Sequence, residues 1–216
     1  MTPLSLIQHT DHEDFLGFAA RRLLASPLDA HASDAGPSDY DLNPGIRPAT
    51  RSGLIPAAVL VPIVERSDLT VLLTERTAHL SAHAGQIAFP GGKIDPGDGG
   101  PRQAALREAR EEIGLDPRFV TLLGYLEPYH TGTGYLITPV VARVEPGFTL
   151  TPDPAEVEDV FEVPLAFLMN EANHTVDSRE WQGGARQFYA MHYEQRYIWG
   201  ATAGIIRALY RRLSSA

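Results

Sequence analysis

Three glutamates gathered near the end of one short stretch could together bind a metal ion. Glu108, Glu111 and Glu112 fall on one side of a predicted helix, within an arc of about 100°, with Arg107 beside them. Helix geometry alone disfavours this, because carboxylates near a helix C-terminus oppose its dipole and Glu108 and Glu112 repel each other at i,i+4. A bound dication would reverse both penalties, and Mg²⁺ and Mn²⁺ prefer oxygen ligands. The pattern therefore indicates a hard-cation site.

A solvated helix surface is the alternative interpretation of the same residues. Arg107 and Glu111 are spaced for a salt bridge, and charged helices are common on protein surfaces. The glycines before the helix favour the metal site. Pro90, Gly91 and Gly92 end an apolar strand, and a glycine-rich turn can bring the backbone close to a ligand.

The helix that must position the glutamates is predicted over about residues 101–113. A proline suits its first turn, where the missing N–H is no loss, and Gly114 suits the position after its last turn. Leu106 and Ala109 fall on a different side from the carboxylates and are expected to face the core. Ala104 lies on the carboxylate side one turn earlier, where its small side chain would leave room for a ligand.

Together these residues resemble the Nudix box, whose pattern is G-x5-E-x7-R-E-U-x-E-E-x-G-U with U aliphatic. Residues 107–115, REAREEIGL, match its second half. The first half departs, because Gly99 stands where the pattern has glutamate and Lys93 where it has glycine. Asp95 and Asp98 are the acids of that loop, and the resemblance implies that Asp98 does part of the missing glutamate's work.

A second block, residues 72–92, is similar to the signature of the coenzyme A pyrophosphatase branch of this family. That signature reads roughly L-L-T-x-R-S-x-x-L-R-x-H-x-G-Q-x-A-F-P-G-G, and the longer loop before the helix is also typical of the branch. The chain departs from it at Ser81, where the branch usually has an arginine. The likeness covers roughly residues 53–212. The matching residues are Leu72, Leu73, Thr74, Arg76, Leu80, His83, Gly85, Gln86, Ala88, Phe89, Pro90, Gly91 and Gly92.

The resemblance implies an α/β (α+β) fold, a Nudix-type α/β/α sandwich with a mixed sheet. It implies metal-dependent hydrolysis of the pyrophosphate bond of coenzyme A or its thioesters, giving 4′-phosphopantetheine, or its acyl form, and 3′,5′-ADP. Mg²⁺ or Mn²⁺ is the implied cofactor. The implied metal ligands are Glu108, Glu111 and Glu112; the implied catalytic residues are Glu111, Glu112 and Arg107; and the implied substrate-binding residues are Arg76, Gly85, Gln86, Phe89, Gly91 and Gly92.

Two other functions stay open. The departure at Ser81 favours a Nudix hydrolase of another nucleoside diphosphate derivative, such as ADP-ribose or NADH. Gly99 in place of a glutamate favours a catalytically weak Nudix-fold binding module, although the intact R-E-x-x-E-E argues against it.

Other residues allow both a functional and a structural interpretation. His79 and His83 have the i,i+4 spacing of zinc ligands on a helix, but no third ligand is evident nearby. Glu156 is either a further acid of the site or a charge at the entry to a strand. Tyr129 and His130 either contact the nucleotide or lie on a surface loop. Core or interface packing and base stacking are the alternatives for Trp181, Trp199 and Tyr210.

Composition excludes several classes of protein. The 216 residues suit one domain with extra segments, and the net charge of −9 gives no footprint for nucleic acid or an anionic membrane. There are no cysteines, which excludes disulfides and thiolate metal sites. The N-terminal residues do not resemble a secretory signal, and the apolar stretches are too short to span a bilayer. We therefore expect a cytoplasmic enzyme with a small nucleotide substrate and no nucleic-acid or membrane partner, and leave a homodimer open.

Interleaved strands and helices predict a layered domain over residues 53–216. Before it, residues 1–52 are expected to form an N-terminal helix and a Pro/Ser/Asp-rich segment. Residues 26–52 of that segment read as a flexible connection or a loop laid over the surface. The expected elements are a helix at 14–24; strands at 57–65, 70–76, 119–129 and 135–145; a short strand and helix within 156–170; a hairpin within 185–200; and a helix at 201–213.

Overall fold

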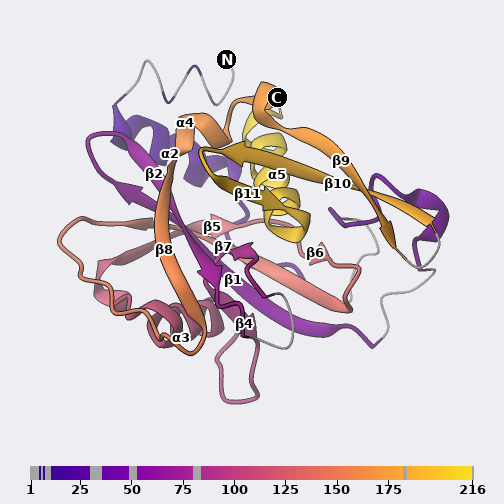
Figure 1. The fold of residues 1–216 in the computed structure, drawn as a ribbon. Coiled ribbons are helices and arrows are strands. Elements are labelled where there is room, and N and C mark those ends of the chain that lie inside the picture. The colour runs from indigo at the N-terminus through magenta and orange to yellow at the C-terminus, as the bar shows by residue number, and fades with distance from the viewer. Residues whose placement is uncertain are drawn as a thin grey trace.

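A computed structural model describes residues 5, 7, 11–29, 36–48, 53–79, 84–181 and 184–215, without the side chain of Trp181. At its centre lies an eight-stranded sheet (Figure 1). The strands are β1 (Ile55–Glu65), β2 (Leu69–Arg76), β3 (Ile87–Ala88), β4 (Gly91–Lys93), β5 (Val120–Tyr125), β6 (Tyr129–His130), β7 (Tyr135–Val144) and β8 (Val157–Pro164).

The sheet is mixed. Its main path is β3-β2-β1-β7-β5, with β4 beside β1, β6 beside β7 and β8 beside β2. β1 and β7 run parallel, from Ile55 opposite Tyr135 to Val64 opposite Val144, and the pairs around them are antiparallel. Such a parallel pair needs a long crossover. Here the crossover includes the glycine-rich turn and the helix that carries the glutamates.

Helices cover both faces of this sheet. In Figure 1, α3 lies below it, whereas α2, α4 and α5 lie above. No helix of the described residues is long and apolar enough to cross a membrane. The α/β/α sandwich with a mixed sheet is therefore confirmed. The helices are α2 (His12–Arg22), α3 (Pro101–Ile113), α4 (Leu165–Leu168) and α5 (Gly200–Ser214), with short 3₁₀ turns at η1 (Pro44–Ile46), η2 (Pro117–Phe119) and η3 (Glu171–Asn173).

Alternation along β1 builds two cores. Ala58, Leu60 and Val64 join the core beneath α3, while Val61 and Ile63 join the core shared with α2 and α5. Each side chain of this size contributes roughly 1.5–3 kcal/mol when it is buried. A slip of one residue would exchange the two faces, so both cores together fix the register of β1.

The helix α3 has the predicted limits. A proline opens it, and Gly114 ends it in the left-handed conformation at φ 70°. Three alanines, at 104, 105 and 109, are fully buried against the sheet. The expectation that Ala104 leaves room for a ligand is therefore wrong, because its side chain packs in the core.

A second sheet, of three strands, lies beside α5. It consists of β9 (Thr175–Trp181), β10 (Gly184–Tyr193) and β11 (Arg196–Trp199). The predicted hairpin is β10–β11. The strand β9 was not predicted, since the sequence TVDSREW is mostly polar and lacks an alternating apolar face.

The N-terminal helix packs on the main domain through Phe15, Leu16 and Ala19. It starts earlier than predicted because Asp11 caps it, accepting a hydrogen bond from the backbone N–H of Asp14 at 2.8 Å. It also ends earlier, at Arg22, and Leu24 instead pairs with Tyr125. The division of the chain at residue 52 stays a prediction.

Residues 36–48 form a loop laid over the surface, which was one of the two forms expected of this segment. Its Asp39 is a point of attachment: the carboxylate accepts hydrogen bonds from the Tyr129 hydroxyl at 2.8 Å and from the Gly132 N–H at 2.7 Å. Tyr129 and His130 are buried, at 3% and 4% exposure. The surface-loop interpretation of these two residues is wrong, because the segment 36–48 and α5 cover them.

The tight packing of α5 on Tyr129 predicts opposite outcomes for two glycine substitutions. A Cβ at Gly204 would overlap the Tyr129 hydroxyl, so Gly204→Ala should lower the free energy of unfolding by about 1–3 kcal/mol. At Gly17, also inside a helix, the nearest atom is an Arg21 guanidinium nitrogen at 3.4 Å. Gly17→Ala should therefore add about 0.5–1 kcal/mol. Urea denaturation measures both, and equal effects of the two substitutions would contradict the packing described.

Candidate active site

The glycine pair allows β4 to lie between β1 and α3. A Cβ at Gly91 would overlap the Ala58 carbonyl on β1. A Cβ at Gly92 would lie 2.5 Å from the carboxylate carbon of Glu108 on α3. A larger residue at position 91 would force β4 away from β1, so that position requires glycine; at position 92 a Cβ would displace the Glu108 carboxylate.

Glu112 is the buried carboxylate of the site, with 5% of its side chain exposed. Its Oε2 accepts a hydrogen bond from the Gly91 N–H at 3.0 Å, and its Oε1 lies 3.3 Å from an Arg76 guanidinium nitrogen. Burial raises the pKa of Glu112 to about 7, although the Gly91 N–H and Arg76 oppose the shift. The charges of Glu108 and Glu156 raise it further.

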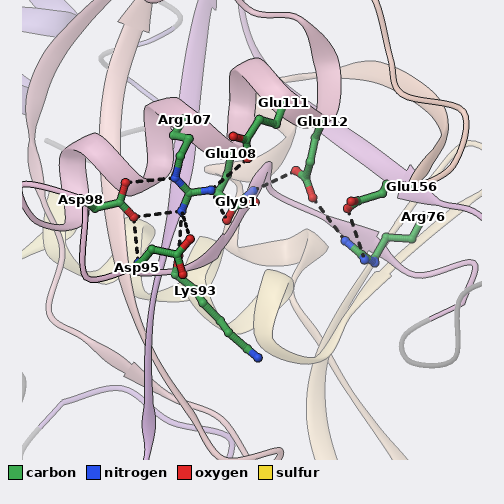
Figure 2. Close-up of polar contacts among 10 residues, drawn as sticks. All are labelled: Arg76, Gly91, Lys93, Asp95, Asp98, Arg107, Glu108, Glu111, Glu112 and Glu156. Carbon is green, nitrogen blue, oxygen red and sulfur yellow. Dashed lines mark hydrogen bonds and ion pairs between the residues drawn. The ribbon is translucent and has the colours of Figure 1, made fainter.

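Glu108 and Glu156 lie near Glu112, as Figure 2 shows. Burial raises the pKa of Glu108, and the hydrogen bond from Arg107 to its Oε1, at 2.9 Å, opposes the shift. Glu156 comes from the loop before β8, and its Oε2 lies 4.0 Å from Arg76. Three carboxylates of the site are therefore balanced by two arginines, Arg76 and Arg107.

Arg107 connects the glycine-rich loop to α3 (Figure 2). Its guanidinium donates to both carboxylate oxygens of Asp98, at 3.0 and 2.9 Å, and to the Lys93 carbonyl at 3.1 Å. It also donates to Glu111 at 2.9 Å. The hydrogen bonds that Arg107 donates to Asp98 raise the pKa of Arg107, and the same bonds hold the pKa of Asp98 below its usual value. Asp98 thus anchors the loop although Gly99 replaces the glutamate of the usual box.

A pocket of about 990 Å³ opens beside these carboxylates. Of the residues expected to bind substrate, all but Gly85 line it. Gly85 instead closes the turn after β2, at φ 66°, where its N–H donates to the Arg76 carbonyl. Among the expected metal ligands, Glu108 and Glu112 line the pocket. Glu111 does not, and its side chain, 59% exposed, is paired with Arg107.

The donor set fits a hard dication bound together with a phosphate. In the described part of the chain, no three His, Asp or Glu side chains are grouped closely enough to hold a metal ion by themselves. Glu108 and Glu112 nevertheless line the pocket, and burial raises the pKa of each, so a bound cation would stabilise their charged forms. Mg²⁺ is commonly bound by one or two carboxylates, with phosphate oxygens and waters completing its shell.

Two parts of the pocket wall were not expected from the sequence. One is the segment 36–48, which contributes Asp39 and Tyr40 to the wall and contains no recognisable sequence motif. The other is the face of the small sheet, where Trp199 lies on the pocket wall. Tyr210 lies elsewhere and donates a hydrogen bond to Glu171. The zinc hypothesis and the departure from the branch signature depend on residues outside the described ranges. His83 belongs to the zinc hypothesis and Ser81 is the departure; Leu80, a matching residue of the signature, and the side chain of Trp181 also lie outside the described ranges.

Comparison with known proteins gives the family. A family model described as the NUDIX domain matches residues 54–182. The protein called uncharacterized Nudix hydrolase NudL in Escherichia coli K12 is 45% identical over 154 residues, which cover 71% of this chain and 80% of that protein. NudL of Shigella boydii serotype 18 shows the same identity and coverage.

The chain belongs to the Nudix hydrolase family. Nudix hydrolases act on nucleoside diphosphate derivatives and generally need divalent metal ions. Similar solved structures include the Nudix hydrolase RenU of M. smegmatis, at 27% identity and a TM-score of 0.45 over 52% of this chain and 72% of that one. The Nudix domain of Shewanella oneidensis NrtR, solved with ADP ribose, has 24% identity and a TM-score of 0.41 over 59% and 82%.

The buried charge of Glu112 predicts a pH-dependent loss of stability in the metal-free Nudix protein. The pKa of Glu112 is about 7 when folded against 4.5 ordinarily, so the folded state binds more protons between these pH values. The free energy of unfolding therefore falls as the pH rises from about 4.5 to 7. Glu112→Gln should be more stable than wild type above pH 7, by on the order of 1–3 kcal/mol.

Denaturant unfolding in a chelator, across this pH range, measures the effect. Glu171→Gln is the control, because its ion pair with Arg207 holds the pKa of Glu171 below the ordinary value. Removing that carboxylate should not flatten the fall in stability between pH 4.5 and 7. Parallel curves for wild type and Glu112→Gln would show that Glu112 carries no such penalty.

Proposed function

We propose that this Nudix hydrolase cleaves the pyrophosphate bond of coenzyme A or its thioesters. One observation carries the proposal: the block that resembles the coenzyme A branch shares a pocket with Glu108 and Glu112. The block contributes Arg76, Gln86 and residues 87–89 to its wall. At about 990 Å³ the pocket is at the upper end for small-molecule sites, which suits a substrate as large as coenzyme A.

The proposed cofactor is Mg²⁺ or Mn²⁺, with Glu108, Glu111 and Glu112 as its protein ligands. When bound, the ion would neutralise part of the diphosphate charge and make the attacking water more acidic. Glu111 or Glu112 would accept the proton of that water. Glu112 is the better placed, because it lines the pocket whereas Glu111 is turned toward Arg107.

The two arginines would have different roles. Arg107 holds Asp98, Glu108 and Glu111 and lies off the pocket wall, so it would orient the carboxylates and not contact substrate. Arg76 lines the pocket and would supply positive charge to the substrate. Attack of water at one phosphorus breaks its bond to the bridging oxygen. The leaving phosphate takes that oxygen, and two phosphate monoesters result.

A substrate panel with Mg²⁺ and with Mn²⁺ tests this function. We expect kcat/KM for coenzyme A or an acyl-coenzyme A to exceed the values for ADP-ribose and NADH, with products identified by chromatography. The reason for this expectation is that residues of the block that resembles the coenzyme A branch line the pocket. If ADP-ribose were the better substrate by about tenfold or more, roughly 1.4 kcal/mol of transition-state binding, the coenzyme A proposal would be wrong and the family assignment would stand.

Substitution of the carboxylates tests the site. Glu112→Gln and Glu111→Gln keep the shape of the side chain but remove the charge that a hard cation needs. Each should lower kcat by roughly a hundredfold or more. Added Mg²⁺ or Mn²⁺ should raise the melting temperature of wild type, and that of the variants less.

Glu171→Gln is the matched control. Glu171 is 58% exposed and paired with Arg207 at 2.7 Å, much as Glu111 is paired with Arg107, but it lies outside the pocket. It should keep both its activity and its metal-induced shift. Full activity and a full shift in the Glu111 and Glu112 variants would mean that these helix carboxylates only form surface salt bridges.

A further inference from the structure

The small sheet presents two arginines side by side to the pocket. Arg179 on β9 and Arg186 on β10 are directly opposite each other in the antiparallel register, so their side chains lie on the same face. Both line the pocket that also contains Glu108 and Glu112. Arg186 also lies against the β6–β7 turn, since one of its guanidinium nitrogens would be 3.5 Å from a Cβ at Gly132.

Neither arginine has an acidic partner within the described ranges. Asp177 shares their face of the sheet, but its carboxylate accepts a hydrogen bond from the Tyr197 hydroxyl at 2.7 Å. Asp39 lies near Gly132, but its two oxygens are taken by Tyr129 and the Gly132 N–H. Among the described residues, the two guanidinium groups therefore face the pocket without a direct ion pair to either of these acids.

A like-charged pair directly across two strands is destabilising, and a protein with a net charge of −9 has acids available to relieve it. A solvated surface would explain one exposed arginine. It does not explain why two converge on a pocket. Paired guanidinium groups are well suited to a phosphate, because each offers several N–H donors in a fixed plane.

Aromatic rings adjoin the arginines on the same face of the sheet. Phe188 is two residues beyond Arg186 on β10, and Trp199 lies beside it on β11, with ring centroids 5.2 Å apart. Both line the pocket. Residues i and i+2 of a strand are about 7 Å apart, so a nucleobase on the rings would bring its sugar close to the arginines.

The segment 36–48 fixes this wall in place. The side-chain amide of Asn43 makes two hydrogen bonds to the backbone of Gln187, at 2.7 and 2.9 Å. Asp39 attaches the same segment to the β6–β7 region through Tyr129 and Gly132. Figure 1 shows the far end of the β9–β10 hairpin beside this segment. The strand β10, which carries Arg186, is thus attached through this segment to the main domain, and β9, which carries Arg179, pairs with β10.

We propose that Arg179 and Arg186 bind a phosphomonoester of the substrate, on its ribose and apart from the diphosphate that is cleaved. The site would make the enzyme prefer nucleotides with this extra phosphate over those without it. The inference rests on the proposed function, in which a nucleoside diphosphate derivative occupies the pocket, and adds a determinant of its specificity.

Product binding tests the proposal without catalysis. 3′,5′-ADP and 5′-AMP share the adenosine and the 5′-phosphate and differ by one phosphomonoester. By calorimetry, wild type should bind 3′,5′-ADP at least about tenfold more tightly, and added salt should reduce the difference. Arg179→Gln/Arg186→Gln should bind the two nucleotides about equally. Equal affinities in wild type, or a preference retained by the double variant, would overturn the proposal.

Arg21→Gln/Arg118→Gln is the matched control. It removes the same charge from residues that do not line the pocket, so it should keep the preference for 3′,5′-ADP. Melting curves of both double variants check the fold. If the Arg179 and Arg186 variant does not fold, Arg186→Gln alone, measured with the same two nucleotides, should still lose most of the preference.

Kinetics with coenzyme A and dephospho-coenzyme A separate this proposal from the proposed function. Hydrolysis of both at equal kcat/KM would refute the arginine site and support the coenzyme A activity. Failure to hydrolyse either, with an arginine-dependent preference for 3′,5′-ADP, would keep the arginine site and refute the coenzyme A activity. Both proposals together predict that the preference for coenzyme A disappears in the arginine double variant.

Discussion

The hydrogen bond between the Glu112 carboxylate and the Gly91 N–H sets the separation of the helix and the glycine-rich turn. This hydrogen bond is 3.0 Å long because buried alanines let α3 lie close to the sheet and because Gly91 has no Cβ that would separate the two elements. The same closeness removes water from Glu112, which is why its pKa rises to about 7. The fold therefore builds a carboxylate whose charge calls for a cation, and a short bond keeps that carboxylate facing the pocket.

Arg107 balances the charge of the neighbouring carboxylates of α3 and of the loop before it. It accommodates Asp98, Glu108 and Glu111 around one guanidinium, and Asp98 joins the loop to the helix from one position before the usual glutamate. Removing Arg107 would leave three carboxylates without the cation that they share, so the network acts as a unit. It leaves Glu108 and Glu112 directed to the pocket and Glu111 directed to the arginine.

The sequence correctly predicted elements whose ends are set by residues next to them in the chain. The helix of residues 101–113 has a proline at its start and Gly114 at its end, and both signals act within one turn. The residues that sequence could not place depend on distant partners. Ala104 is buried by the sheet, Tyr129 by α5 and by Asp39, and β9 forms only because β10 pairs with it. Half of the candidate site followed from the motif, and the wall that carries Arg179 and Trp199 has no motif.

Acids of α3 and arginines of the small sheet line different parts of the pocket, and this has a consequence for how an anionic substrate would be held. At one end Glu108, Glu112 and Glu156 repel phosphate unless a dication is bound, and Arg76 is already committed to two of these acids. At the other end the proposed arginine pair is positive without any ion. On the two proposals, the metal-free protein holds a nucleotide by the arginine end alone, and the dication adds the diphosphate end. On these proposals the acidic end carries out the hydrolysis and the basic end selects the substrate. Mutations could therefore change the substrate preference without changing the hydrolysis step.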